Sequence, residues 1–289
     1  MKVCNCEDGK SSPDADGYCE NCGLLCKPKL NKANQDNSRN HFEISCTPNL
    51  ALVSNIGLQH GENQDFGNVL IKGENIVIVV SDGVSASAGA AFASTTAVNT
   101  VCSLLLEYSE HSDPKGVMIN AIEAANTEIK KKQNTESLPM SAECTIVAAL
   151  VVNNTVTIGW VGDSRAYLIS DKDIKLTIDD SWVEEAVTAG IMSRMEALKD
   201  KNVHCITQSL GMSNQDVDIH ITQTEIEKNQ LLLLCSDGLW NCFEKDNDFI
   251  NHINEYKCEN LLGLCNSFVD KANLLGSDDD ITVAIYKYL

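Results

Sequence analysis

The 289-residue sequence lacks a long apolar segment, a secretory signal and an excess of basic side chains. No apolar run approaches the roughly 18 residues of a transmembrane helix, so we expect a soluble protein. Met1, Lys2 and Val3 are followed at once by cysteine and acidic residues, which is not the pattern of a signal peptide. The net charge of −19 argues against nonspecific binding to nucleic acid or anionic membranes. These absences predict a cytoplasmic protein with one large domain and at most a small appendage.

The cysteines are too unevenly placed to predict a secreted disulfide framework. Five of the 13 lie within the first 26 residues, and most of the others are scattered singly. The scattered ones stand in apolar settings, as at Cys102, Cys144, Cys235 and Cys265. We therefore predict that these are small core residues in a reducing compartment.

The N-terminal cysteines predict a small zinc-ribbon-like module at residues 1–27. Two close pairs, separated by a polar loop, match a tetrathiolate site in which the metal supplies the folding energy. The predicted ligands are Cys4, Cys6, Cys19 and Cys22, with Cys26 as a substitute. A redox dithiol at Cys19 and Cys22, or unligated cysteines, are the alternatives. Residues 28–41 are rich in Asn, Lys and Ser and predict a linker, so the main domain would span 42–289.

The main domain contains one short pattern twice. Residues 76–80 form a branched apolar run, typical of a buried strand, and Ser81-Asp82-Gly83 follows; 155 residues later an apolar run ends in Ser236-Asp237-Gly238. An unpaired carboxylate at the end of a buried strand is costly, so something positive should compensate it. Two such aspartates, each followed by a glycine that permits close backbone approach, indicate a shared, oxygen-rich cation site. The alternative is that each is merely a turn after a strand.

The apolar periodicity predicts many strands and two pairs of helices. Two Ser-x-x-Glu capping boxes, at Ser181 and Ser193, predict short helices near 182–189 and 194–200. Because strands and helices do not alternate, we expect an α+β fold: two antiparallel sheets packed face to face with helices outside, an α-β-β-α sandwich. The other expected helices are 85–108, one that opens at Pro114, and one through 261–272. The expected strands are 50–56, 66–71, 76–80, 144–152, 155–161, 166–169, 219–226, 231–235 and 281–286.

Six stretches carry a resemblance to a known family. They are ENQDF, VVSDG, WVGDSRAYL, LTIDDSWVEEAVTAG, LLLLCSDGLW and DDITVAI. In this order the chain resembles, over residues 50–289, the bacterial type of the metal-dependent serine/threonine protein phosphatases of type 2C (the PPM family). The resemblance implies a β-sandwich with helices on both sides and a two-metal centre at one end.

The resemblance also implies roles for individual residues. Asp82 is similar to the carboxylate that bridges both metals, and the Gly83 carbonyl to a ligand of the first. Asp237 and Asp279 are similar to ligands of the second metal, and Asp65 to an outer residue that acts through a metal-bound water. Asp163 is similar to a ligand of a third metal; its alternative role is to pair with Arg165 or cap the turn.

The ligand chemistry agrees with the resemblance. A set of carboxylate and carbonyl oxygens favours Mg²⁺ or Mn²⁺ over zinc. Two such ions can share a water, and the resulting hydroxide would hydrolyse phosphoserine or phosphothreonine in a substrate protein phosphorylated by a serine/threonine kinase. None of the 13 cysteines stands in an anion-binding loop with arginine, which argues against a cysteine phosphatase. A metal-binding pseudophosphatase that acts as a regulatory interaction module is the alternative.

The sequence departs from the family pattern near the predicted site. His60 stands where members commonly have a phosphate-binding arginine, so it is the candidate phosphate contact; the alternative is a surface histidine without a role. Asp280 replaces the asparagine that usually follows the last metal aspartate, and we expect it to add negative charge. Residues 182–210 match the variable flap beside the active site, a candidate determinant of substrate choice.

Overall fold

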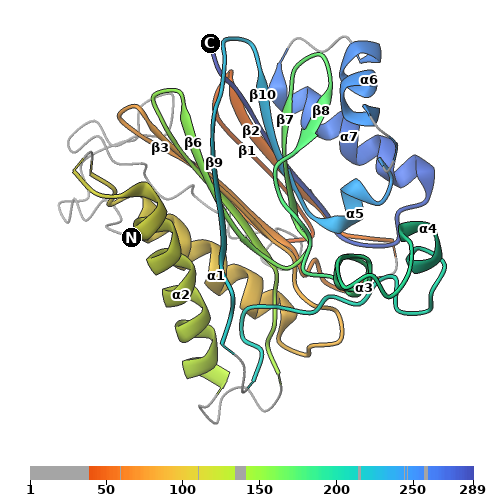
Figure 1. Cartoon of the computed structure of the whole chain (residues 1–289). Coiled ribbons are helices and arrows are strands. Elements are labelled where there is room, and N and C mark those ends of the chain that lie inside the picture. Colours follow the sequence, from red (N-terminus) through yellow and green to blue (C-terminus); the bar gives the residue numbers. More distant parts are fainter. Residues whose placement is uncertain are drawn as a thin grey trace. The chain divides into compact units, whose positions relative to one another are not determined.

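The computed structural model describes residues 39–58, 60–109, 111–133, 141–213, 216–243, 245, 247–256 and 260–289 (Figure 1). The fold described here is that of the unit Asn40–Leu289. The predicted zinc module and most of the predicted linker lie outside the described residues. Within the described ranges, no helix combines the length and the apolarity that crossing a membrane requires.

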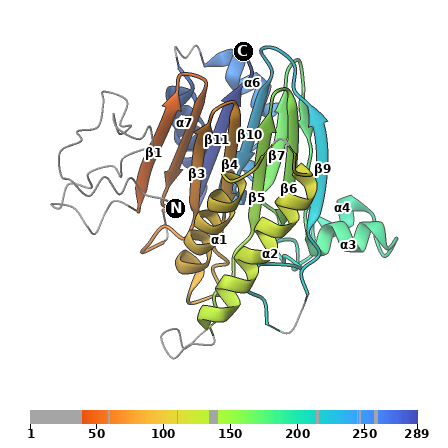
Figure 2. The same cartoon turned by 90° about the vertical axis from the view of Figure 1, so that its left-hand side faces the viewer.

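Two antiparallel sheets pack face to face, as the sequence predicts (Figures 1 and 2). In spatial order the six-stranded sheet contains β1 (His41–Thr47), β2 (Leu50–Asn55), β11 (Ile281–Lys287), β10 (Leu231–Cys235), β7 (Arg165–Ile169) and β8 (Asp173–Lys175). In spatial order the five-stranded sheet contains β3 (Phe66–Lys72), β4 (Asn75–Ser81), β5 (Ile146–Val152), β6 (Thr155–Val161) and β9 (His220–Glu225).

Helices cover the outer face of each sheet. α1 (Ala90–Leu105) and α2 (Pro114–Gln133) pack on the five-stranded sheet (Figure 2). On the six-stranded side lie α5 (Asp237–Trp240), α6 (Asp248–Glu255) and α7 (Leu261–Leu275). The flap, residues 182–210, contributes the short helices α3 (Trp182–Thr188) and α4 (Arg194–Ala197). The predicted α-β-β-α sandwich is therefore confirmed.

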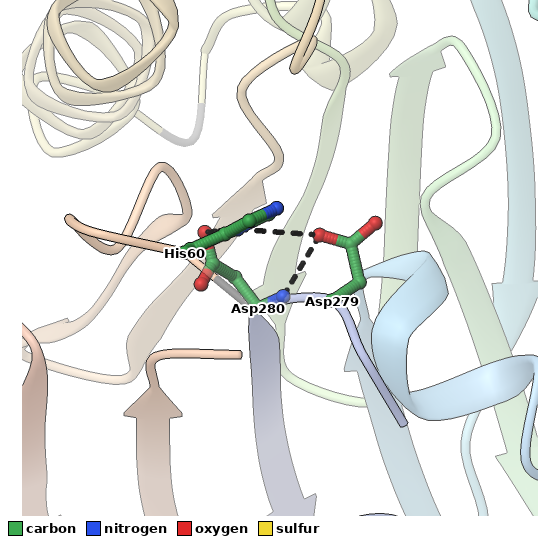
Figure 3. Close-up of side chains that lie close together, drawn as sticks. All are labelled: His60, Asp279 and Asp280. Carbon is green, nitrogen blue, oxygen red and sulfur yellow. Dashed lines mark hydrogen bonds and ion pairs between the residues drawn. The ribbon is translucent and has the colours of Figure 1, made fainter. Parts of the chain in front are cut away.

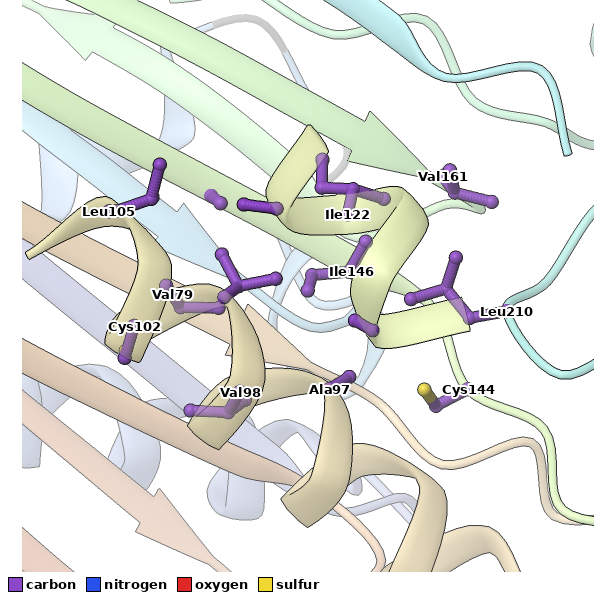
Figure 4. Close-up of a cluster of buried hydrophobic side chains, with 14 of the residues drawn as sticks. Val79, Ala97, Val98, Cys102, Leu105, Ile122, Cys144, Ile146, Val161 and Leu210 are labelled. Atoms are coloured by element: carbon purple, nitrogen blue, oxygen red, sulfur yellow. The ribbon is translucent and has the colours of Figure 1, made fainter. Parts of the chain in front are cut away.

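Three apolar layers hold the sandwich together, because successive side chains of a strand point to opposite faces. In β4, Val77 and Val79 pack against α1 and α2, whereas Ile78 and Val80 pack against the other sheet (Figure 4 shows the layer with Val79). A third layer, which includes Phe268, lies between the six-stranded sheet and α7. The end of β4 is thus fixed on both faces, and with it the position of Asp82.

The structure differs from the sequence expectations in four unpredicted elements and in the bounds of several predicted helices and strands. Strands β1 and β8 and helices α5 and α6 were not predicted; β1 and β8 are edge strands with partly exposed side chains. The helix expected from residue 85 begins at Ala90, because the backbone of 84–89 instead bonds to residues 141–143. The predicted burial of Cys102, Cys144, Cys235 and Cys265, by contrast, is confirmed.

Candidate metal centre

Three strands end or begin at one edge of the sandwich and bring three aspartates there. Asp82 directly follows β4, Asp237 stands two residues after β10, and Asp279 stands two residues before β11. β10 and β11 are antiparallel neighbours, with Cys235 opposite Val283, so the end of one lies beside the start of the other. The paired register therefore places Asp237 and Asp279 at the same edge, while β4 delivers Asp82 from the other sheet.

These side chains line one cavity of about 770 Å³. Asp82, Asp163, Asp237 and Asp279 all lie on its wall, together with His60. Among the residues that the structure describes, no lysine or arginine lines it. The predicted aspartates thus share one cavity whose wall offers no permanent positive charge.

Burial and mutual repulsion raise the pKa values of these carboxyl groups. Burial first, and then the charges of neighbouring aspartates, raise the pKa of Asp82 and of Asp163 well above the usual range. Burial and the charge of Asp279 raise the pKa of Asp237 to about 6. Asp237 Oδ1 is buried and has no hydrogen-bond partner among the described residues. Such a cluster of unneutralised acids fits a bound cation.

The two glycines after the aspartates are required by close packing. A Cβ on Gly83 would lie 2.7 Å from the Gln64 carbonyl oxygen and 2.8 Å from that of Ala90. A Cβ on Gly238 would collide with the Asp280 carbonyl. Neither glycine has a positive φ, so the close packing, rather than a left-handed backbone, requires glycine at these two positions. The glycines let the segments that carry the aspartates pack closely together.

The His60 side chain is partly exposed and lies on the cavity wall, where its ring faces Asp280 (Figure 3). Its Nδ1 lies 3.0 Å from Asp280 Oδ2 and 3.8 Å from Asp279 Oδ1. Asp280 also accepts hydrogen bonds from the backbone N–H groups of Gly57, at 2.7 Å, and of Gln64, at 2.6 Å. The carboxylate therefore fixes both ends of the turn that carries His60, a structural role that the sequence analysis missed.

The environment of His60 favours its charged form. Burial lowers the pKa of the imidazole, but the hydrogen bond and charge of Asp280, with the charges of Asp279 and Asp237, outweigh burial and raise it. His60, Asp279 and Asp280 are the one trio of potential metal ligands in the described ranges whose ligand atoms all lie within 4.8 Å of one another.

Asp65 lies behind the cavity wall rather than on it. Its side chain is fully buried, and the Ser236 hydroxyl donates a hydrogen bond of 2.6 Å to Asp65 Oδ2. Burial and the charge of Asp280 raise its pKa well above the usual range, and its own charge acts on Asp82 in turn. This placement agrees with an outer position relative to the other aspartates.

The ion pair with Arg165, one of the two alternative roles of Asp163, is not found among the described residues. The Arg165 guanidinium binds Asp179 instead, with Nη2 2.6 Å from Oδ2 and Nε 3.0 Å from Oδ1. Arg165 also stacks over the Trp240 ring, 3.3 Å from its centroid, and the Trp240 indole N–H donates to the Asp163 carbonyl at 2.9 Å. Asp163 is thereby positioned through its backbone, which leaves its carboxylate at the cavity. This cluster was not predicted, although the sequence signal for it is the adjacent acidic pair Asp179-Asp180.

The flap closes one side of the site. The Ser193 capping box is complete, and Ser181 accepts from the Glu184 N–H, so both predicted helix starts are confirmed. Both helices are shorter than expected. A smaller cavity of about 90 Å³ lies under the flap and shares Asp163 and Asp237 with the larger one.

Comparison with known proteins relates this chain to one family. The sequence model of the family described as protein phosphatase 2C matches residues 59–263. The serine/threonine phosphatase stp of Listeria monocytogenes is 28% identical over 228 residues, which cover 77% of this chain and 89% of that protein. The solved serine/threonine phosphatase of S. agalactiae has a TM-score of 0.75 at 27% identity and covers 86% of this chain and 100% of that one.

A further solved structure, of the catalytic domain of the serine threonine protein phosphatase PstP, contains two manganese ions. It has a TM-score of 0.66 at 23% identity and covers 82% of this chain and 96% of that one. At this level of identity the likeness concerns the fold.

Proposed function

Because the chain belongs to the protein phosphatase 2C family and is a metal-dependent protein serine/threonine phosphatase, we propose that Asp82, Asp237 and Asp279 hold its catalytic cations. The observation that carries this proposal is the convergence of these carboxylates, from both sheets, on one cavity. No lysine or arginine of the described residues lines that cavity, and His60 faces Asp280, so we take a bound cation as the source of the compensating charge.

The residues present fit Mn²⁺ or Mg²⁺. All proposed donors are oxygens, which suit these ions, and Asp237 Oδ1 has no hydrogen-bond partner among the described residues. We assign Asp82 to both ions, the Gly83 carbonyl to the first, and Asp237 and Asp279 to the second. Asp65 would act from the outer position that Ser236 fixes. Asp163, with Asp237, would hold a weaker third ion.

Two divalent cations bound there would lower the pKa of a bound water and neutralise charge on the phosphoryl oxygens. The chain's own carboxylates position the ions. The described cavity wall offers no thiol–arginine pair for a covalent route: Cys242 lies on it, but no arginine does. Water is therefore the proposed nucleophile, and phosphoserine or phosphothreonine in proteins is the proposed substrate.

We assign phosphate binding to His60. Its Nδ1 faces Asp280, which holds the ring at the cavity wall, where its other ring nitrogen is the proposed donor to phosphate. An imidazole supplies one donor there rather than the fork of an arginine, so its contribution should be modest. We expect His60→Ala to raise KM more than it lowers kcat, and His60→Arg to lower KM about tenfold. A KM for His60→Ala equal to that of wild type would exclude the role.

From the cysteine spacing we also propose that residues 1–27 bind one zinc ion through Cys4, Cys6, Cys19 and Cys22, that 28–41 are a linker, and that 42–289 are the catalytic domain. Metal analysis of the full-length protein should then find one zinc, which a Cys19→Ser and Cys22→Ser double variant should lose without loss of aryl phosphatase activity. Zinc-free wild-type protein would contradict this. We further propose a cytoplasmic location, from the cysteine usage, and, as partners, phosphoproteins made by a serine/threonine kinase, from the family.

Steady-state hydrolysis of p-nitrophenyl phosphate and of a phosphothreonine peptide tests the assignment of the cations. We expect activity with Mn²⁺ or Mg²⁺ and none in excess EDTA. Activity that persists in EDTA would contradict metal dependence. An inactive protein that nevertheless binds Mn²⁺ would support the alternative, a pseudophosphatase.

A further inference from the structure

The rim of the catalytic cavity carries exposed apolar side chains that no part of the mechanism uses. Leu275, the last residue of α7, lines the cavity and is 53% exposed, and Leu274 beside it is 81% exposed. Single exposed leucines are ordinary on protein surfaces. A leucine at the mouth of a catalytic cavity, however, lies where a substrate must pass.

The backbone around Leu275 is firmly held. Gly276 ends α7 in the left-handed conformation with φ 90°, and the Ser277 N–H bonds the Ala272 carbonyl at 3.0 Å. The Ser277 hydroxyl donates to the Gly238 carbonyl at 2.8 Å, which ties this rim to the residue after Asp237. Leu275 is therefore a fixed part of the wall.

The flap presents a second apolar surface to the same cavity. Ile206 lines the cavity, and Leu198, which is 53% exposed, lines the smaller cavity beneath the flap. The two cavities have lining residues in common, so they adjoin one another: Asp163, His204, Asp237 and Asn241. Apolar surface therefore borders the site both on the rim at the end of α7 and on the flap.

The rim of the cavity is negatively charged. Asp278 is exposed on the rim three residues from Leu275, and five aspartates line the cavity without a lysine or arginine among the described residues. Bound cations would compensate the aspartates that hold them, but Asp278 is not a proposed ligand. Acidic groups on a substrate would meet a negative rim and a chain of net charge −19.

A cavity of about 770 Å³ holds more than a phosphate group, and the polypeptide that carries the phosphate must cross its rim. We propose that Leu275 and Ile206 form a subsite for an apolar side chain next to the phosphorylated residue, and that Asp278 disfavours acidic neighbours. This inference rests on the proposed phosphatase function and names the class of segment it prefers: apolar, or basic, but not acidic.

Phosphothreonine peptides that differ only in the residues flanking the phosphothreonine test this subsite. The flanks would be leucine, lysine, alanine or glutamate, on either side, in the full-length Mn²⁺-loaded protein. Each kcat/KM is divided by that for p-nitrophenyl phosphate, which has no flanking residues. We expect leucine to exceed alanine by about fivefold on at least one side, and glutamate to fall below alanine.

Three variants locate the effect. Leu275→Ala should reduce the leucine-to-alanine ratio towards one, and Asp278→Asn should reduce the discrimination against glutamate. Leu289→Ala is the matched control, because Leu289 is 66% exposed but follows the opposite end of β11.

The possible outcomes separate this inference from the proposed function. Equal kcat/KM for all flanks in wild type, or a leucine preference that survives in Leu275→Ala, would overturn the subsite and leave the phosphatase assignment standing. Failure to hydrolyse any peptide and p-nitrophenyl phosphate alike would overturn the proposed function, and the subsite with it.

Discussion

Two groups of aspartates lie near the same end of the sandwich, and they differ in whether basic side chains of the protein neutralise them. Asp179 is buried with Arg165 Nη2 at 2.6 Å and Lys175 Nζ at 3.3 Å. Asp82 and Asp237 have no lysine or arginine at ion-pair distance in the described part of the chain. The first group is neutralised by the protein itself, whereas the second is left for a ligand to neutralise. This difference distinguishes aspartates with a structural role from aspartates proposed to bind the catalytic cations.

The largest expected effect comes from removing a charge in the second group. Asp82→Asn or Asp237→Asn should lower kcat for p-nitrophenyl phosphate by about 10³-fold, roughly 4 kcal/mol of barrier, because each truncates a proposed metal ligand. Asp270→Asn, an exposed residue on α7, is the control and should match wild type. Near-normal turnover in both variants would remove these residues from the site.

The same substitution should act oppositely on stability in the two groups. In metal-free protein, Asp179→Asn should lower the free energy of unfolding by about 3 kcal/mol, because it leaves Arg165 buried and uncompensated. Asp237→Asn should raise it by about 1 kcal/mol, since it relieves repulsion among the aspartates that line the cavity. Urea unfolding in EDTA measures both. Destabilisation of similar size in Asp179→Asn and Asp237→Asn would show that the two groups of aspartates do not differ in their effect on stability.

Asp280 shares features of both groups, because its carboxylate has a structural role and lies beside the proposed metal ligands. Asp280→Asn retains one acceptor oxygen for two backbone N–H donors, so we expect a loss of about 2 kcal/mol in stability and a raised KM as the His60 turn loosens. Asp173→Asn is the matched control, since Asp173 also accepts two backbone bonds, from Phe249 and Ile250. That control should lose stability but keep its KM; an unchanged KM in Asp280→Asn would leave Asp280 with a structural role alone.

The smallest effect is expected where an ion pair is exposed. Arg194 and Glu184 approach to 2.6 Å on the flap, but the Arg194 side chain is 53% exposed. Water and salt screen such a pair, so Arg194→Met should change the free energy of unfolding by less than about 1 kcal/mol. A loss as large as that of Asp179→Asn would show that proximity, rather than burial, decides what an ion pair contributes.

The residues that could be predicted from sequence are those whose local pattern has one reading. The apolar runs before Asp82 and Asp237 could only be buried strands, and they are β4 and β10. The partner of Arg165 could not be predicted in this way. Asp163 is two residues away and Asp179 is fourteen, yet the guanidinium binds the distant one, because the fold brings residue 179 alongside β7.

By itself the sequence determined the sandwich, the ends of the main strands and the aspartates that follow or precede them, because strand periodicity and burial are local properties of the chain. Only the tertiary structure decided which acids would be neutralised, since that depends on which side chains long-range packing brings within a few ångströms. It also decided that Asp280 would hold the turn that carries His60. In the sequence these residues are 220 positions apart, and only the packing of the turn against the start of β11 makes them neighbours.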